Sequence, residues 1–146
     1  VVAEINKLAQ QYEIPLSQII VDEDGVGGGV VDQLKCKGFV NNSSPLYSEN
    51  FNNLKSQCYF KLADEIKLNK MYVHSDEPEF IARLIEELEQ VKQKDMDKDG
   101  KKMVVPKDKV KELLGRSPDI SDMLMMRMWF EIKKKIDNQD DDFFAG

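Results

Sequence analysis

The sequence contains little of what several common site chemistries require. It has 2 cysteines and 1 histidine in 146 residues. Cys36 and Cys58 lack the close spacing of a zinc site or a redox motif, so we expect both to be reduced residues of the core. No nucleophile motif accompanies His74, which leaves a Ser-His-Asp arrangement without support.

Long apolar runs and an excess of basic charge are also missing. The sequence has no stretch of about 18 apolar residues and no charged-then-apolar leader, so neither a membrane span nor a secretion signal is indicated. The 27 acidic residues outnumber the 21 basic ones, for a net charge of -6. This balance argues against a basic coat for nucleic acid, but it is compatible with carboxylates that gather around metal ions.

Residues 19–34 carry the first motif, which reads as a buried strand ending at Asp22, a glycine-rich turn and a helix. An acid at the carboxyl end of a strand lies where open α/β sheets place ligands. Val30 stands where a dinucleotide site needs its third glycine, and the Gly-Lys-Ser/Thr of a P-loop is absent. The glycines therefore either let the helix pack closely on the strand or clear space beside Asp22 for a metal and a nucleic-acid backbone. The rest of the chain favours the second explanation.

The remaining pattern alternates strands and helices, which predicts one α/β domain over residues 1–136. Residue 38, a glycine, is expected to end the helix that starts near residue 28. The helix over 77–87 is expected to turn its apolar face inward, with Phe80, Ile81, Leu84, Ile85 and Leu88. A hairpin is predicted over 89–105 and an acidic tail over 137–146. Further helices are predicted over 2–12, 50–66, 106–114 and 119–135, and extended segments over 39–40 and 71–73.

A second acidic motif opens the last predicted helix. Asp119 and Asp122 are three residues apart in its first turn and share a face, with Ser117 as the expected N-cap. Acids in a first turn commonly complement the helix dipole. Two acids on one face, together with Asp22, also suit a Mg²⁺ or Mn²⁺ site, because convergent carboxylates repel one another unless a cation lies between them.

These two motifs together resemble a known family. The first block is Asp-Glu-Asp-Gly-Val-Gly-Gly-Gly-Val-Val-Asp-Gln-Leu from Asp22 to Leu34, and the second is Gly-Arg-Ser-Pro-Asp-Ile-Ser-Asp from Gly115 to Asp122, preceded by Pro106-Lys107. They are similar to the nuclease domain of the phage terminase large subunit, the endonuclease part of tailed-phage DNA-packaging motors. The resemblance implies an RNase H-like, resolvase-related α/β fold: a mixed sheet with flanking helices and an inserted β-hairpin.

The resemblance also implies roles for particular residues. Asp22 corresponds to the family's second acid and Asp119 to its third, with Asp122 as an auxiliary acid, all three catalytic through bound Mg²⁺ or Mn²⁺. Asp24 matches less well, because the family often has a small residue there. The family's hairpin is thought to meet DNA, and an ordinary solvated face explains the lysines near it about equally well. Those lysines include Lys94, Lys98, Lys101, Lys102 and Lys107.

The implied function is cleavage of concatemeric DNA by a metal-dependent endonuclease of a phage or prophage terminase. The implied partners are double-stranded DNA, an ATPase domain on the same longer chain, the small terminase subunit and the portal, in the cytoplasm of the bacterial host. In this family the first acid lies on a strand upstream of the first helix, where this sequence begins. We therefore expect the first acid and the first strands to precede Val1 and the site in this chain to be incomplete.

Two other readings stay open. The turn 95–100, Asp-Met-Asp-Lys-Asp-Gly, matches the first half of an EF-hand loop, but Pro106 stands where the loop needs its last glutamate. Under this first alternative, the chain is a Ca²⁺-binding or interaction module that uses this turn. The other reading is a stand-alone resolvase-like nuclease, which the absence of an upstream ATPase domain with a P-loop would indicate.

Overall fold

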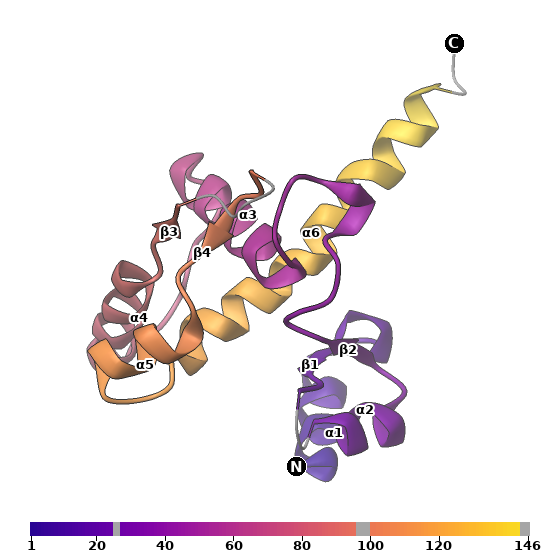
Figure 1. The fold of residues 1–146 in the computed structure, drawn as a ribbon. Helices are drawn as coiled ribbons and strands as arrows, with labels where there is room; N and C mark the ends of the chain where they lie inside the picture. Colours follow the sequence, from indigo (N-terminus) through magenta and orange to yellow (C-terminus); the bar gives the residue numbers. More distant parts are fainter. Residues whose placement is uncertain (25–26, 96–99, 144–146) are drawn as a thin grey trace. The chain divides into compact units, whose positions relative to one another are not determined.

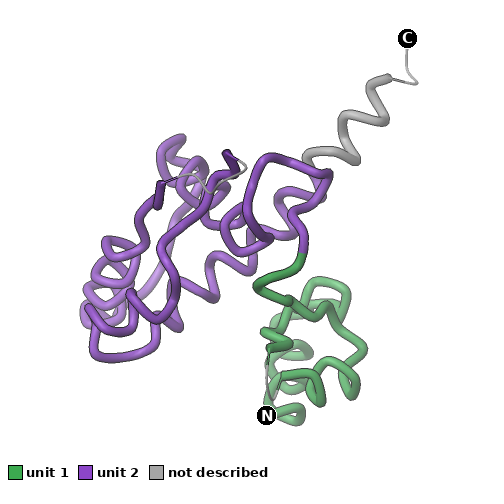
Figure 2. The backbone as a smooth tube through the Cα atoms, in the orientation of Figure 1, with its two compact units in different colours: residues 1–43 green, residues 44–146 purple. Residues whose placement is uncertain are grey.

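A computed structural model gives the fold, and it describes residues 1–24, 27–95 and 100–143, with side chains up to residue 134 (Figure 1). The chain divides into two compact units, Val1–Ser43 and Ser44–Gly146 (Figure 2). Helices and short strands occur in both units, so the predicted α/β class is confirmed in its mixed composition. No described helix is both long enough and apolar enough to cross a membrane.

Unit 1 contains the strand–turn–helix motif. The parallel strands β1 and β2 pair in register, with Asp22 opposite Phe39, and helix α2 connects them. Leu34 and Phe39 are buried here, and α2 packs on α1 and on both strands. The elements are α1 (Val2–Gln11), β1 (Ile20–Asp22), α2 (Gly28–Leu34) and β2 (Lys37–Phe39).

The prediction that Gly38 ends α2 is wrong. The helix ends at Leu34, and Lys35 takes the left-handed conformation, with φ 53°. Gly38 lies inside β2 instead, opposite Val21. A Cβ atom on Gly38 would overlap the carboxylate of Glu23, so this glycine makes room for a side chain that follows β1.

Unit 2 is mainly helical, and its core lies between α3 and α6. The buried side chains include Cys58, Leu62, Met125 and Met128. Strands β3 and β4 form the predicted hairpin, with Gln93 paired to Val104, and Gly115 ends α5 in the left-handed conformation, with φ 67°. The elements are α3 (Leu54–Lys67), α4 (Pro78–Gln90), β3 (Gln93–Lys94), β4 (Met103–Val104), α5 (Lys107–Leu114) and α6 (Asp119–Phe143).

Three predictions for unit 2 need correction. Helix α6 continues to Phe143, past its predicted end near residue 135 and into the predicted tail. The side chain of Ile85 is 52% exposed, whereas Glu87 on the same helix is fully buried. The cause is that α4 faces α6 as well as α5, and Glu87 bonds to the first turn of α6.

The described residues form two separate two-stranded sheets, one in each unit, in place of the single mixed sheet that the sequence suggests. The segment 71–73, predicted to be extended, belongs to no helix or strand. Of the three predicted catalytic acids, Asp22 ends strand β1, whereas Asp119 and Asp122 lie in the first turn of α6.

Candidate functional site

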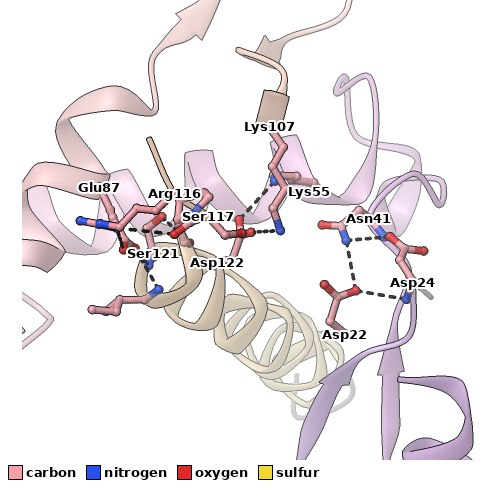
Figure 3. A network of polar contacts seen from close by, with 12 residues as sticks. Asp22, Asp24, Asn41, Lys55, Glu87, Lys107, Arg116, Ser117, Ser121 and Asp122 are labelled. Atoms are coloured by element: carbon pink, nitrogen blue, oxygen red, sulfur yellow. Dashed lines mark hydrogen bonds and ion pairs between the residues drawn. The ribbon is translucent and has the colours of Figure 1, made fainter. Parts of the chain in front are cut away.

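Asp22 lies at the carboxyl end of β1, next to a second carboxylate and an amide (Figure 3). Its Oδ1 atom accepts hydrogen bonds from the backbone N–H of Asp24, at 3.1 Å, and from Nδ2 of Asn41, at 3.3 Å. Nδ2 of Asn41 also donates to Oδ2 of Asp24 at 2.7 Å. The carboxyl ends of parallel β1 and β2 thus bring two acids and one amide together, which is the edge where α/β sheets bind ligands.

Gly27 explains why the turn after Asp22 needs glycine. A Cβ atom at Gly27 would overlap the backbone carbonyl of Asp22, whereas Cβ atoms at Gly28 and Gly29 would meet nothing within 4 Å. The start of α2 therefore approaches the end of β1 more closely than a residue with a side chain at position 27 would allow. The structure confirms the close packing of the helix on the strand at Gly27. Space for a metal and a nucleic-acid backbone beside Asp22 stays a prediction.

The second acidic pair belongs to unit 2, in the first turn of α6. Asp119 is exposed, but Asp122 is buried, with 7% of its surface exposed. The two acids therefore differ in environment, although they are three residues apart on one helix. Only Asp119 has the exposure expected of a residue that meets a ligand from solvent.

Asp122 is held by two lysines and a tyrosine. Its Oδ1 atom lies 3.2 Å from Nζ of Lys55 and accepts a hydrogen bond from the Tyr59 hydroxyl at 2.8 Å. Its Oδ2 atom lies 2.5 Å from Nζ of Lys107. Burial by itself disfavours the charged form, but the two lysines and the tyrosine outweigh burial and hold the pKa of Asp122 below its ordinary value. Both oxygens are engaged, which favours a role in placing the two lysines over direct metal binding.

The same tyrosine shows how strongly this network is buried. Burial first, and then the negative charge of Asp122, raise the pKa of Tyr59 far above its usual range. Its hydroxyl also lies 3.2 Å from Oγ of Ser121. Burial likewise raises the pKa of the neighbouring Cys58 thiol to about 12, so this cysteine is an unreactive core residue, as predicted.

Glu87 fixes the position of the first turn of α6. Its Oε2 atom accepts the backbone N–H groups of Ile120 and Ser121 at 2.9 and 2.8 Å. Its Oε1 atom pairs with Arg83, at 3.3 Å, and with Arg116. Glu87, on another helix, therefore supplies the acceptor for first-turn N–H groups that was expected from the hydroxyl of the N-cap Ser117.

The hairpin lysines have different environments. Lys94 and Lys101 are exposed on or beside the hairpin, while Lys98 lies outside the described residues. Nζ of Lys102 lies 5.9 Å from the ring centroids of both Phe51 and Phe60, and its backbone pairs with residues 50 and 52. Lys107 pairs with Asp122. DNA contact by these lysines stays a prediction, with Lys94 and Lys101 the best placed.

Two other candidate sites from the sequence were the turn 95–100 and His74. The turn 95–100, the basis of the Ca²⁺-module reading, falls mostly outside the described residues, as 96–99 are not among them. His74 is exposed, and its ring stacks on Tyr72 with centroids 6.4 Å apart. Among the residues that the structure describes, no group of 3 or more His, Cys, Asp or Glu side chains could hold a metal ion.

Neither Asn41 nor Glu87 was expected from the sequence. Asn41 follows a strand parallel to β1, so the strand-end rule that singled out Asp22 could also have found it. Glu87 lies on the apolar face of α4 with Leu84, and a charged residue at such a position is the signal of a buried polar contact. Lys55 was also not expected; it lies on α3 one helical turn before Tyr59, and both side chains contact Asp122.

Solved structures of a phage protein match this chain. The first match is a lysine-to-alanine variant of the nuclease domain of the large terminase subunit gp2 of bacterial virus Sf6 with manganese, with a TM-score of 0.68 and 24% identity over 84% of this chain and 69% of that one. The nuclease domain of gp2 without that change matches with a TM-score of 0.67 and 25% identity, over 84% and 68%. The chain has the fold of the large-terminase nuclease domain.

A third structure, a lysine-to-alanine variant of gp2c of the large terminase subunit from bacteriophage Sf6 with calcium, matches with a TM-score of 0.66 and 25% identity over 84% of this chain and 68% of that one. No protein-family model and no curated protein matches the sequence. The family resemblance seen in the two sequence motifs is thus confirmed by the fold, across both units of the chain.

Proposed function

We propose that this chain belongs to a metal-dependent DNA endonuclease of a phage packaging terminase. The observation that carries the proposal is the pair Asp22 and Asp24 at the carboxyl end of β1, in a chain with the terminase nuclease fold. The fold supports a nuclease, and the relatives with manganese and calcium support a divalent cation. The RNase H-like order of the complete sheet is part of this proposal.

The donor set in unit 1 fits a divalent cation. Mg²⁺ and Mn²⁺ prefer oxygen ligands such as carboxylates, and Asp22 and Asp24 provide two carboxylates at one edge. The contacts within the group use one oxygen of each carboxylate, Oδ1 of Asp22 and Oδ2 of Asp24, which leaves a second oxygen on each outside the network. Bound divalent ions supply an activated water and stabilise the leaving oxygen of a phosphodiester.

The residues of the chain have distinct proposed roles. Asp22 binds the cation. Gly27 lets α2 start against the backbone carbonyl of Asp22, where a side chain would not fit. Asp119, in unit 2, is also proposed as a metal ligand, from its motif in the sequence and its exposure. Asp122 places Lys55 and Lys107, two cations whose charges suit a DNA phosphate. The ATPase domain, the small subunit and the portal remain proposed partners of the longer protein.

The test is DNA cleavage in the presence of Mn²⁺ by the longer protein that the resemblance predicts. Asp22→Asn and Asp119→Asn each keep the size of the side chain and remove its charge, and each should abolish cleavage. Asp32→Asn on α2 and Asp108→Asn on α5 change exposed acids in the same units and should leave cleavage intact. Wild-type cleavage by Asp22→Asn, or cleavage that survives removal of divalent metal by a chelator, overturns the proposal.

A further inference from the structure

We propose that Asn41 is the positioning residue of this site: it fixes the Asp22 and Asp24 carboxylates in the arrangement that binds a divalent cation. This inference rests on the proposed function, because it assigns the geometry of the same site. It also answers how two acids of like charge remain side by side at one strand end.

The contacts of Asn41 define which atom faces the acids. Its backbone N–H donates to Oδ2 of Asp24 at 3.1 Å, and its side chain reaches the same oxygen at 2.7 Å and Oδ1 of Asp22 at 3.3 Å. Both partners of the side chain are carboxylate oxygens, which only accept hydrogen bonds, so the NH₂ group must face them. The amide oxygen then points away from these two carboxylate oxygens.

The charge of the side chain matters as much as its reach. An amide donates hydrogen bonds without neutralising the acids, so Asp22 and Asp24 retain their charge for a cation. Asp122 shows the opposite arrangement, in which two lysines satisfy the carboxylate and cancel its charge. A lysine at position 41 would hold the two acids equally well but would repel the metal.

The fold of the loop does not need the Asn41 side chain. The turn after β2 is closed by Ser43, whose N–H and hydroxyl donate to the carbonyl of Val40 at 3.1 and 2.8 Å. The strands extend their pairing through the N–H of Glu23 and the carbonyl of Phe39 at 2.9 Å. These contacts involve no atom of the Asn41 side chain, so its three-residue network serves the carboxylates and not the turn.

The test is calorimetric titration of the 146-residue chain with Mn²⁺ at a temperature where every variant is folded. Asn41→Ala should weaken Mn²⁺ binding by about tenfold or more, the usual effect of removing a group that orients metal ligands. Gln33→Ala removes an exposed amide of α2 in the same unit and should bind as wild type does. A purely structural residue would lower the melting temperature and leave the dissociation constant of the folded protein unchanged.

Two further variants separate the possible failures. Asn41→Ser keeps a small polar side chain that cannot reach both acids, and it replaces Asn41→Ala if that variant does not fold. Asp22→Asn should abolish the binding. If Asp22→Asn abolishes binding while both Asn41 variants bind like wild type, the role of Asn41 is overturned and the proposed site stands. If Asp22→Asn itself binds like wild type, the site is elsewhere and the proposed function fails with it.

Discussion

The two groups of acids in this molecule have opposite kinds of partner for their negative charge. In unit 1, Asp22 and Asp24 lie together and receive hydrogen bonds from neutral donors. In unit 2, Asp122 and Glu87 are buried, and each is paired with basic side chains. Buried charges must be compensated to be tolerated at all. Asp22 and Asp24 receive hydrogen bonds from neutral groups, which do not compensate their negative charge. They lie at the edge of the sheet, which is the arrangement that a cation site requires.

This contrast assigns stability to one group and function to the other. Substitution of Asp122 or Glu87 should cost folding free energy, because it removes a buried carboxylate on which hydrogen-bond donors and basic side chains converge. Substitutions in the unit 1 acids should cost metal binding and little stability, since they relieve a repulsion. Four sets of substitutions test this division in order of decreasing effect on the free energy of unfolding.

The largest loss is expected for Glu87→Ala. The change leaves the N–H groups of Ile120 and Ser121 and the guanidinium of Arg116 without their shared acceptor. Loss of one partner from a buried ion pair costs about 3–5 kcal/mol. Glu86→Ala is the matched control, because Glu86 is the next residue, is 57% exposed and also pairs with Arg116. That control should cost at most about 1 kcal/mol, and equal losses in urea unfolding would contradict the assigned role.

Asp122→Asn should be the next most destabilising, by about 3 kcal/mol. The amide keeps an acceptor for Tyr59 but removes the negative charge that faces the ammonium groups of Lys55 and Lys107. The pKa of Asp122 is lowered in the folded chain, so its contribution is full above the ordinary aspartate pKa of about 4 and is lost as the pH falls further. The difference between wild type and variant should therefore shrink below pH about 4, measured by unfolding at several pH values. A constant difference would show that the charge is not the cause.

Gly27→Ala should cost about 1–3 kcal/mol, since the new methyl group overlaps the carbonyl of Asp22 and the helix must move. Gly28→Ala places a methyl group in open space at the start of the same helix. It should therefore leave stability unchanged or raise it by up to about 1 kcal/mol. Thermal unfolding of the pair measures the packing at the turn directly, and similar melting temperatures would refute the close contact.

The smallest change in stability is expected for Asp22→Asn and Asp24→Asn. Each variant keeps its acceptor oxygen and removes one of two neighbouring negative charges, so unfolding should change by less than about 0.5 kcal/mol or become slightly harder. Asp22→Asn should nevertheless abolish Mn²⁺ binding. A large loss of stability in either variant would place these acids with the structural group and break the comparison.

Local patterns in the sequence predicted much of the fold. The strand ending at Asp22, the helix after the glycines and the hairpin all follow from short-range periodicity and turn residues. The two-block resemblance then identified the terminase nuclease fold. The prediction for Gly38 was wrong because glycine suits both a helix end and a crowded position in a strand. Only the pairing with β1 shows that Gly38 lies in a strand.

The partners of the acids could not be predicted in the same way. Glu87 bonds to backbone groups 33 and 34 positions later in the chain, and nothing in its local sequence names them. Lys55 and Lys107 meet at Asp122 from two different helices, so their cluster exists only in the folded chain. Periodicity could show that a polar residue is buried, but the identity of its partner depends on tertiary packing.

The most direct test of the central claim is a crystal structure of this chain soaked with Mn²⁺, with the ion located by its anomalous scattering. The account predicts an ion within about 2.0–2.6 Å of carboxylate oxygens at Asp22, beside an Asn41 that still bonds to Asp24. An ion found only among the aspartates of the turn 95–100 would contradict it. That result would leave the Ca²⁺-module reading as the better description of this chain.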